Sequence, residues 1–359
     1  MPFDASSTTL APAERGDRTA TRAIAFWLLA VAGMIWAMVA LGGATRLTGS
    51  GLSIMEWAPI SGILPPMSEA EWQRLYDLYR TIPQYQLVNA GFGMEGFRRI
   101  FWLEWLHRLW GRLIGLAYLL PFLWFWIRGQ IPRPLLPRLL LLFLLGGLQG
   151  VIGWFMVASG FEEGRTEVSP YRLVLHLGMA FLLYGLVLWT ALDLLRPTLP
   201  AAAGPAEARL RPWVRGAVWL AIATMLAGGF VAGIRAGFTY NSFPLMDGQW
   251  LPPGYFDLSP WWKNLTANIA AVQFNHRLLA TLTLLGAAAA AVLAWRQLPP
   301  GRARGLVLAL FAAVALQYGL GVLTLLYVVP VGLGTLHQAV AVLVLTMGLL
   351  ALHGLRRPA

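Results

Sequence analysis

The sequence predicts an all-α integral membrane protein in which eight transmembrane helices form two pseudo-symmetric four-helix bundles. Hydrophobic residues make up 58% of the 359-residue chain and charged residues only 12%, well below the share of about 25% in soluble domains. Eight apolar runs are each long enough to cross a bilayer, which takes about 20 residues. Helices are expected because a lipid-exposed segment must satisfy its backbone hydrogen bonds internally, and no alternating strand pattern is present.

The apolar runs divide the chain into two halves. Met1–Arg22 is a polar tail with no apolar core of its own, so we expect a cytoplasmic tail and neither a signal nor a transit peptide. Segment 196–215 is expected to be a cytoplasmic linker between a first bundle, 23–195, and a second, 216–355. The expected spans are Ala23–Ala44, Ile100–Trp126, Leu139–Ala158, Leu173–Leu195, Gly216–Ile234, Ile269–Trp295, Leu306–Val328 and Gly332–His353.

The basic residues predict the orientation of these spans. Lys and Arg are in excess in the tail, the second, fourth and sixth loops and the C-terminus, which places both termini in the cytoplasm. The two long loops, Thr45–Arg99 and Arg235–Asn268, then face outward. Their Pro, Gly and Trp content is typical of ordered caps over the bundles.

Composition excludes several kinds of function. The net charge of +11 is accounted for by helix orientation, and no basic run is interleaved with aromatic residues, so no nucleic-acid partner is expected. The chain contains no Cys, which excludes disulfides, thiolate nucleophiles and Cys-held metals.

The two halves share short motifs in the same order, which indicates a parallel internal duplication. Each motif is weak alone, and the argument depends on their common order and spacing. The motifs are His-Arg-Leu at 107–109 and 276–278, Leu-Gln at 148–149 and 316–317, and Leu-His at 175–176 and 336–337.

Four of the five histidines occupy matching places, His107 and His176 in the first half and His276 and His337 in the second. Each is expected near the outer end of its span. For any single histidine the alternative is a ring hydrogen-bonded to a backbone carbonyl. The fifth, His353, has no counterpart and is expected at the cytoplasmic interface.

Two pairs of histidines at one depth favour two haem groups, each held by one pair. Zinc needs further tight ligands that are missing here, and a di-iron centre needs several glutamates. Haem requires only one or two axial ligands and an apolar slot. The sequence therefore predicts two bis-His haem sites.

Arginines gather near the same end of the spans. Because arginine clamps carboxylates with two hydrogen bonds, they are candidates to bind haem propionates that point outward. Their alternative role is to reach lipid headgroups. The candidates are Arg46, Arg108, Arg112, Arg235 and Arg277, with Arg98 and Arg99 nearby.

Glu104 distinguishes the two halves, because its counterpart in the second half is Gln273. It precedes His107 by three residues and so shares a helix face with it. A carboxyl group beside only one of two parallel sites favours a catalytic first haem and an electron-transferring second haem. The alternative is an ion pair between Glu104 and Arg108.

Longer stretches of the sequence resemble the haem A synthase family, in its Cys-free, eight-span branch, from about residue 22 to residue 355. The stretches are TRLTGSGLSIMEW (45–57), GILPP (62–66), EWLHRLWGRLIG (104–115), GLQGVIGWFMVASG (147–160), VSPYRLVLHLG (168–178), AGIRAGFTYNSFPLMDG (232–248), VQFNHRLLA (272–280) and LHQAVAVLVL (336–345).

This resemblance implies an enzyme of the bacterial inner membrane that oxidises the C8 methyl group of haem O to a formyl group by successive hydroxylations, giving haem A. His107 and His176 would flank the substrate haem with Glu104 as the catalytic acid, and His276 and His337 would ligate haem b. Both haems would lie toward the periplasmic side. The resemblance also implies a functional link to haem O synthase and to cytochrome oxidase assembly, and it is compatible with a homo-oligomer in the lipid bilayer. It leaves open the electron donor or acceptor and the source of the formyl oxygen.

The rival function is a bis-His di-haem electron carrier of the cytochrome b type. Such a carrier usually stacks its haems at two depths, whereas all four histidines here are expected at one. A transporter would be expected to have helices broken near the midplane. The Gly and Pro interruptions of this chain lie mainly in the outer loops.

Overall fold

The computed structural model describes residues 12–195 and 204–355, and no strand is present in these two ranges. Eight of the helices that it describes are long and apolar enough to cross a membrane, which confirms the eight predicted spans. The orientation of the termini relative to the membrane stays a prediction. Residues 1–11 of the expected tail, 196–203 of the expected linker and 356–359 lie outside the described residues.

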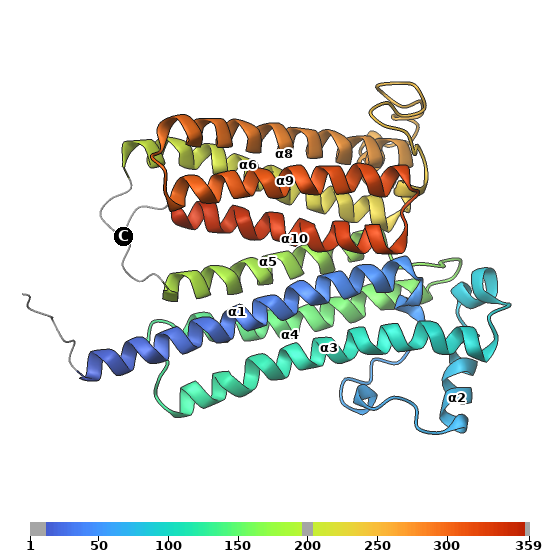
Figure 1. Ribbon diagram of the computed structural model, residues 1–359. Coiled ribbons are helices and arrows are strands. Elements are labelled where there is room, and N and C mark those ends of the chain that lie inside the picture. The colour runs from blue at the N-terminus through green and yellow to red at the C-terminus, as the bar shows by residue number, and fades with distance from the viewer. Residues whose placement is uncertain (1–11, 196–203, 356–359) are drawn as a thin grey trace, which may run out of the picture.

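The eight spans form two groups of four. Helices α1, α3, α4 and α5 pack chiefly on one another, as do α6, α8, α9 and α10. The groups meet where α1 contacts α10 and where α5 contacts α6, and Figure 1 shows them as two layers of roughly parallel helices. Their bounds are α1 Pro12–Leu47, α3 Gly93–Ile127, α4 Leu136–Ala158, α5 Pro170–Leu195, α6 Pro205–Gly233, α8 Ile269–Gln297, α9 Arg302–Leu326 and α10 Val331–Gly354.

Two helices begin well before the apolar runs that predict them. Helix α1 starts at Pro12, inside the expected tail, and α6 starts at Pro205, inside the expected linker. Proline suits the first turn of a helix because its missing N–H would be unpaired there. The length of an apolar run therefore predicts the part of a helix that lies in the bilayer. It does not predict the polar turns that extend the helix beyond the bilayer.

A hydrophobic cluster fills each group of spans in the half away from the long loops. The first group packs Ile24, Leu28, Tyr118 and Leu139 in this region, and a second cluster joins the matching parts of α6, α8, α9 and α10. All four paired histidines lie outside these clusters, toward the end that carries the long loops. We call this the loop end.

The first long loop, residues 48–92, folds over the loop end as a first cap. It is built around α2 (Glu69–Tyr79), which is light blue at the lower right of Figure 1. Ser68 begins α2 by accepting a hydrogen bond from the backbone N–H of Glu71 at 3.2 Å. Trp72 of α2 then packs edge-on against Phe101 of α3, with ring centroids 4.9 Å apart. The Ser-x-x-Glu pattern that marks a helix start was present in the sequence.

Ion pairs hold the first cap together. Arg74 of α2 donates hydrogen bonds to both carboxylate oxygens of Glu56, at 2.8 and 3.0 Å, and to Glu71 at 2.8 Å. The hydrogen bonds from Arg74 hold the pKa of Glu56 below its ordinary value. This cap is therefore fastened by groups that titrate.

The second long loop, residues 234–268, forms a second cap that ends in the short helix α7 (Asn264–Ala267). Here neutral amides make the contacts. Asn264 donates to the carbonyls of Leu258 and Trp261, both at 2.9 Å, and Asn268 donates to the carbonyl of Gly254 at 2.7 Å. Asparagine side chains of this kind do not titrate.

Candidate functional site

The structure brings the four predicted histidines together in two pairs. His107 of α3 and His176 of α5 lie close enough for their charges to interact, and so do His337 of α10 and His276 of α8. All four helices begin at the loop end, and each half supplies one pair. This proximity agrees with the expected pairing, and the binding of haem by each pair stays a prediction.

Each of these four rings faces a glycine on a neighbouring helix. The glycines lie on α1, α4, α6 and α9, so every span of the protein contributes either a histidine or a facing glycine. A Cβ added to Gly42, Gly153, Gly228 or Gly321 would lie 3.2, 2.9, 3.0 and 2.9 Å, respectively, from Cε1 of His107, His176, His276 and His337. Such distances are tighter than ordinary van der Waals contact, so a side chain at these positions would displace the rings.

Two glutamines repeat one contact in both halves. Gln149 of α4 donates through Nε2 to the backbone carbonyl of His176 at 3.1 Å, and Gln317 of α9 donates to the carbonyl of His337 at 3.0 Å. The same Nε2 atoms lie 3.2 Å from Nδ1 of His176 and 3.4 Å from Nε2 of His337. The Leu-Gln repeats therefore place an amide beside one histidine of each pair.

The other histidine of each pair is held differently in the two halves. Nδ1 of His276 lies 3.1 Å from the carbonyl oxygen of Thr224. A carbonyl can only accept, so this nitrogen carries the proton and Nε2 keeps its lone pair. In the first half, Nδ1 of His107 is buried and makes no hydrogen bond within the described residues.

Glu104 is 3% exposed and forms the expected ion pair with Arg108, whose Nε donates to Oε1 at 2.6 Å. The remaining nitrogens of Arg108 donate to the backbone carbonyls of Ile54 and Glu56 in the first cap, at 2.6 and 2.7 Å. Within the described residues Oε2 of Glu104 accepts no hydrogen bond. One carboxylate oxygen thus has no partner among the described residues, on a side chain that lies three residues before His107 on α3.

Gln273 occupies the same place in the second half but is fully engaged. Its Nε2 donates to the carbonyls of Ala236 and Thr239, both at 2.6 Å, and its Oε1 accepts from Arg277 at 2.7 Å. Like Arg108, Arg277 also fastens its own cap. It donates to the carbonyls of Tyr240 and Ser242, at 2.6 and 2.9 Å.

Arg46 and Arg235 converge on a residue that the sequence did not single out, Glu167. Both arginines form ion pairs with the carboxylate of Glu167, in the segment before α5, and Arg46 also donates to the carbonyl of Ala232 at 2.9 Å. Arg46 lies in the last turn of α1 and Arg235 follows α6, so this cluster joins the two halves at the loop end. No short-range pattern marks Glu167, because its two partners are distant in sequence.

Arg112 binds the first cap through the carbonyls of Pro59 and Ala58, both at 2.9 Å. Its Nη1 is buried and unpartnered among the described residues, as is Nε of Arg46 and of Arg277. Arg98 and Arg99 form ion pairs with Glu69 and Glu95, and Nε of Arg98 is likewise buried and unpartnered among the described residues. Three of the candidate arginines therefore retain a buried donor that a further acceptor could use.

His353, expected at the cytoplasmic interface, is buried inside the protein, and its position relative to the membrane stays a prediction. Its side chain is only 2% exposed, its Nε2 lies 3.1 Å from Oδ1 of Asp193, and its ring packs edge-on against Trp189 at 5.2 Å. Asp193 and Trp189 belong to α5, so this contact joins the two halves at the end opposite the caps. Asp193 is 160 residues away in the sequence, so no local sequence pattern could predict this contact.

No cluster of three or more His, Cys, Asp or Glu side chains suited to one metal ion is found within residues 12–195 and 204–355. The paired histidines therefore stay the predicted metal ligands. A pair of imidazoles with no third protein ligand is the donor set that haem iron uses.

Comparison with known proteins places the chain in a family. The profile of a family described as cytochrome oxidase assembly protein matches residues 25–349. The chain is 55% identical to the heme A synthase of Granulibacter bethesdensis over 93% of its own length and 87% of that protein. The chain belongs to the haem A synthase family.

Other members of the haem A synthase family match over almost the whole chain. The heme A synthase of Rhodospirillum centenum is 52% identical over 98% of this chain and 94% of its own length. The heme A synthase of Rhodopseudomonas palustris strain HaA2 is 46% identical over 98% of this chain and 95% of its own length. The resemblance noted in the sequence motifs is confirmed, and it includes both four-helix halves.

Proposed function

We propose that the chain oxidises the C8 methyl group of haem O to a formyl group, giving haem A, and that the two histidine pairs divide the work. His107 and His176 would hold haem O as the substrate, and His276 and His337 would hold a haem b. The activity follows from membership of the haem A synthase family over nearly the full chain. The observation that supports the division is the buried carboxylate of Glu104, three residues before His107 on α3, where the second half has the amide of Gln273.

The residues present fit haem groups in both halves. Nδ1 of His107 and Nδ1 of His337 are buried and unpartnered within the described residues, and each ring lies against a glycine that leaves room for it. In the second pair, the hydrogen bond from His276 to Thr224 fixes the tautomer that presents Nε2 to a metal. A haem b bound there supplies one-electron redox chemistry.

Glu104 would act on protons at the substrate. Oxidation of a methyl group to a formyl group removes protons, and a carboxylate within reach of the reacting group is a suitable acceptor. Arg108 orients the carboxylate through Oε1 and is itself fixed by two carbonyls of the first cap, so Oε2 is the atom that receives the proton. Gln273 cannot take this role in the second half because an amide does not titrate.

Among the arginines, Arg46 and Arg235 are the best candidates to bind propionates, since they lie at the loop end where the two halves meet. A propionate is chemically equivalent to the carboxylate that both already bind. Arg108, Arg112 and Arg277 would contribute chiefly by fastening the caps above the haems, because most of their bonds go to cap carbonyls.

The eight apolar helices make this a multi-pass membrane protein. We place it in the bacterial inner membrane, with both termini in the cytoplasm and the histidine pairs toward the periplasm, because the basic residues favour that orientation. Haem O synthase is then the functional neighbour that supplies the substrate, and cytochrome oxidase assembly consumes the product.

The direct test is to express the chain with a haem O synthase in a host that lacks its own haem A synthase and to separate the extracted haems chromatographically. We expect haem A together with hydroxylated haem O. Unchanged haem O in aerated cells whose purified protein carries two b-type haems would contradict the proposal and favour the di-haem electron carrier.

A further inference from the structure

Glycines interrupt the packed face of α4 on the side of the first histidine pair that is turned away from the loop end. Leu139, Leu142 and Val157 of this face are buried. Gly146 and Gly150 lie between them, and all these residues fall within about 80° around the axis because an α-helix turns by about 100° per residue. Both glycines are nonetheless exposed, and a Cβ added to either would meet no atom within 4 Å. We call the open space beside Gly146 and Gly150 the glycine track.

The glycine track runs from the first histidine pair toward the end opposite the caps. Gly153, the next glycine of this face, lies against His176, because a Cβ added to it would be 2.9 Å from Cε1 of the ring. Gly146 precedes Gly153 by seven residues and is therefore about 10 Å farther from the loop end. Beyond Gly146, the hydroxyl of Tyr118 on α3 donates to the carbonyl of Leu139 on α4 at 2.8 Å. This hydrogen bond closes the far end of the track.

A buried carboxylate lies on the α3 side of the same interface. Glu104 is 3% exposed, and its Oε2 has no partner among the described residues. Glu104, His107 and Tyr118 fall within about 60° around the axis of α3, on the face that meets α4 through Tyr118. The carboxylate, the first histidine pair and the glycine track therefore follow one another along one face of α3.

The second half has side chains at the equivalent positions of α9. The register of the two helices is set by the pairs Gln149 and Gln317, Gly153 and Gly321, and the buried Leu142 and Leu310. In this register Gly146 matches Val314, which is 4% exposed, and Gly150 matches Tyr318. The hydroxyl of Tyr318 lies 3.1 Å from Oγ1 of Thr281 on α8, so this side chain connects α8 and α9. The second half therefore has no glycine track.

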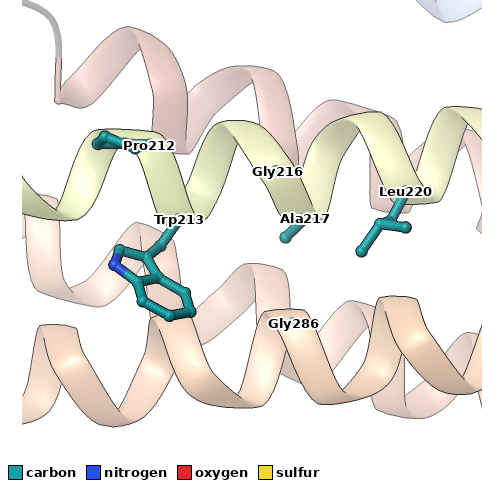
Figure 2. Close-up of a pocket in the computed structure, with 6 residues that line it drawn as sticks. All are labelled: Pro212, Trp213, Gly216, Ala217, Leu220 and Gly286. Carbon is teal, nitrogen blue, oxygen red and sulfur yellow. The ribbon is translucent and has the colours of Figure 1, made fainter.

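The second half does contain a cavity, of about 370 Å³, but no histidine lines it (Figure 2). It lies between α6 and α8, with Leu220 and Gly286 among its lining residues. One turn nearer the loop end, the hydroxyls of Thr224 and Thr283 lie 2.9 Å apart and connect the same two helices. This contact separates the cavity from His276, whose Nδ1 is bound to the carbonyl of Thr224.

We propose that the glycine track holds the hydroxyethylfarnesyl chain of haem O. The inference rests on the proposed function, in which the first pair holds haem O and the second holds haem b. These haems have the same macrocycle and differ at one substituent, where haem O carries a long apolar chain in place of a vinyl group. The two halves likewise share their histidine and glutamine positions and differ where Val314 and Tyr318 replace glycines. The extra space of the first half thus matches the extra group of its ligand.

The wall and the opening of the track suit an apolar chain. Glycine presents only backbone, and inside a helix the N–H and C=O groups are already paired. Gly147, which is also exposed with no atom within 4 Å of an added Cβ, lies between the track and the lipid-facing side of α4 that carries Leu144 and Val151. A chain dissolved in the bilayer therefore has a lateral route to the track.

The test uses the full-length protein, purified with its haem b from a host that lacks haem O synthase and placed in phosphatidylcholine nanodiscs. Haem O and protohaem are titrated in separate experiments, and binding to the first pair is followed by Soret absorbance. Gly150→Tyr and Gly146→Val give the first half the side chains of the second. We expect the Kd for haem O to rise about tenfold or more in Gly150→Tyr and about threefold in Gly146→Val, because the chain is overpacked. The Kd for protohaem should change by less than about twofold, since protohaem has no such chain.

Val151→Tyr and Leu144→Val are the matched controls, because they introduce the same side chains on the lipid-facing side of α4. Both should leave the Kd for haem O unchanged. Resident haem b, measured by pyridine haemochrome spectra, reports that each variant is folded. If Gly150→Tyr loses it, the milder Gly146→Val decides by the same criteria.

Three outcomes would overturn the inference. They are an unchanged Kd for haem O in the glycine variants, an equal rise in the Kd for protohaem, which would assign the space to the macrocycle, and an equal rise in the controls. Binding is measured without turnover. Haem O that binds as expected but is not oxidised would therefore contradict the proposed reaction and leave the inference standing.

Discussion

The two halves of the protein have the same arrangement of helices and histidines. They differ in how many hydrogen bonds fix the side chains around each histidine pair. In the second half, His276 is anchored to Thr224 and Gln273 uses its amide group in three hydrogen bonds. In the first half, Nδ1 of His107 has no partner within the described residues and Glu104 is bound through one oxygen.

Helices α3 and α4 also pack more loosely than their counterparts α8 and α9, whereas α1 and α5 of the first half are buried about as well as α6 and α10. In the most apolar stretch of each span, 11% of the residues are buried in α3 and in α4, against 28% in α8 and 22% in α9. Helix α3 also contacts α4 less extensively than α8 contacts α9. A resident cofactor benefits from a preorganised site, whereas a substrate must enter and leave. The looser packing of α3 and α4 therefore suits the first half to haem O.

The largest effect should come from removing a histidine of the anchored pair. His276→Ala is expected to lower haem b content to about a tenth or less, because the iron loses an axial ligand. Pyridine haemochrome spectra of the purified protein measure this. His353→Gln is the control, since His353 lies sixteen residues beyond His337 on α10, and it should retain haem b; equal loss in both variants would contradict the assignment of the second pair.

Glu104→Gln should separate binding from catalysis. We expect formyl formation to fall by about 10²–10⁴-fold, the usual contribution of a general base, while haem content stays unchanged. Chromatography of extracted haems gives the first quantity and absorbance the second. If haem A formation is undiminished, Glu104 is not catalytic and serves only to form the ion pair with Arg108.

The reciprocal change, Gln273→Glu, should damage stability more than Glu104→Gln does. A carboxylate cannot donate to the carbonyls of Ala236 and Thr239, so two hydrogen bonds are lost and two buried acceptors repel the new charge. The expected cost is roughly 2–4 kcal/mol. Unfolding by denaturant measures it, and equal stability of the two variants would show that the halves are held equally firmly.

Gly228→Ala should displace the ring of His276, since the new methyl group would lie 3.0 Å from Cε1. Overpacking of this kind costs about 1–3 kcal/mol, and lower haem b content would report it. Gly42→Ala should cost less, because His107 has no anchor and its ring can move. Gly319→Ala, with no atom within 4 Å of the added group, is the neutral control.

The smallest effect concerns the two caps. Because Arg74 lowers the pKa of Glu56, the ionised carboxylate stabilises the first cap above the ordinary pKa of a glutamate, and this contribution is lost as the pH falls through the lowered value. Both side chains are nearly half exposed, so less than about 1 kcal/mol is expected. Hydrogen exchange normalised for intrinsic rates should show segment 54–75 loosening in acid, and Arg74→Gln should remove this dependence. The asparagine contacts of the second cap should not respond.

The sequence by itself determined the eight spans and the likeness of the two halves. Bilayer thickness sets the length of an apolar run, so each span can be recognised without its neighbours. The His, Gln and Glu104 positions could be found because a polar residue in such a run is costly and therefore conspicuous. The resemblance to the haem A synthase family was likewise carried by continuous motifs.

Only the tertiary structure decided which groups these residues contact. Glu167 meets Arg46 and Arg235, and His353 meets Asp193, because helices distant in sequence pack side by side. Arg108 and Arg277 bind backbone carbonyls, which every residue carries and which therefore leave no sequence signal. The local pattern of a chain reports what must be buried, whereas the partner of a buried group depends on how whole helices pack.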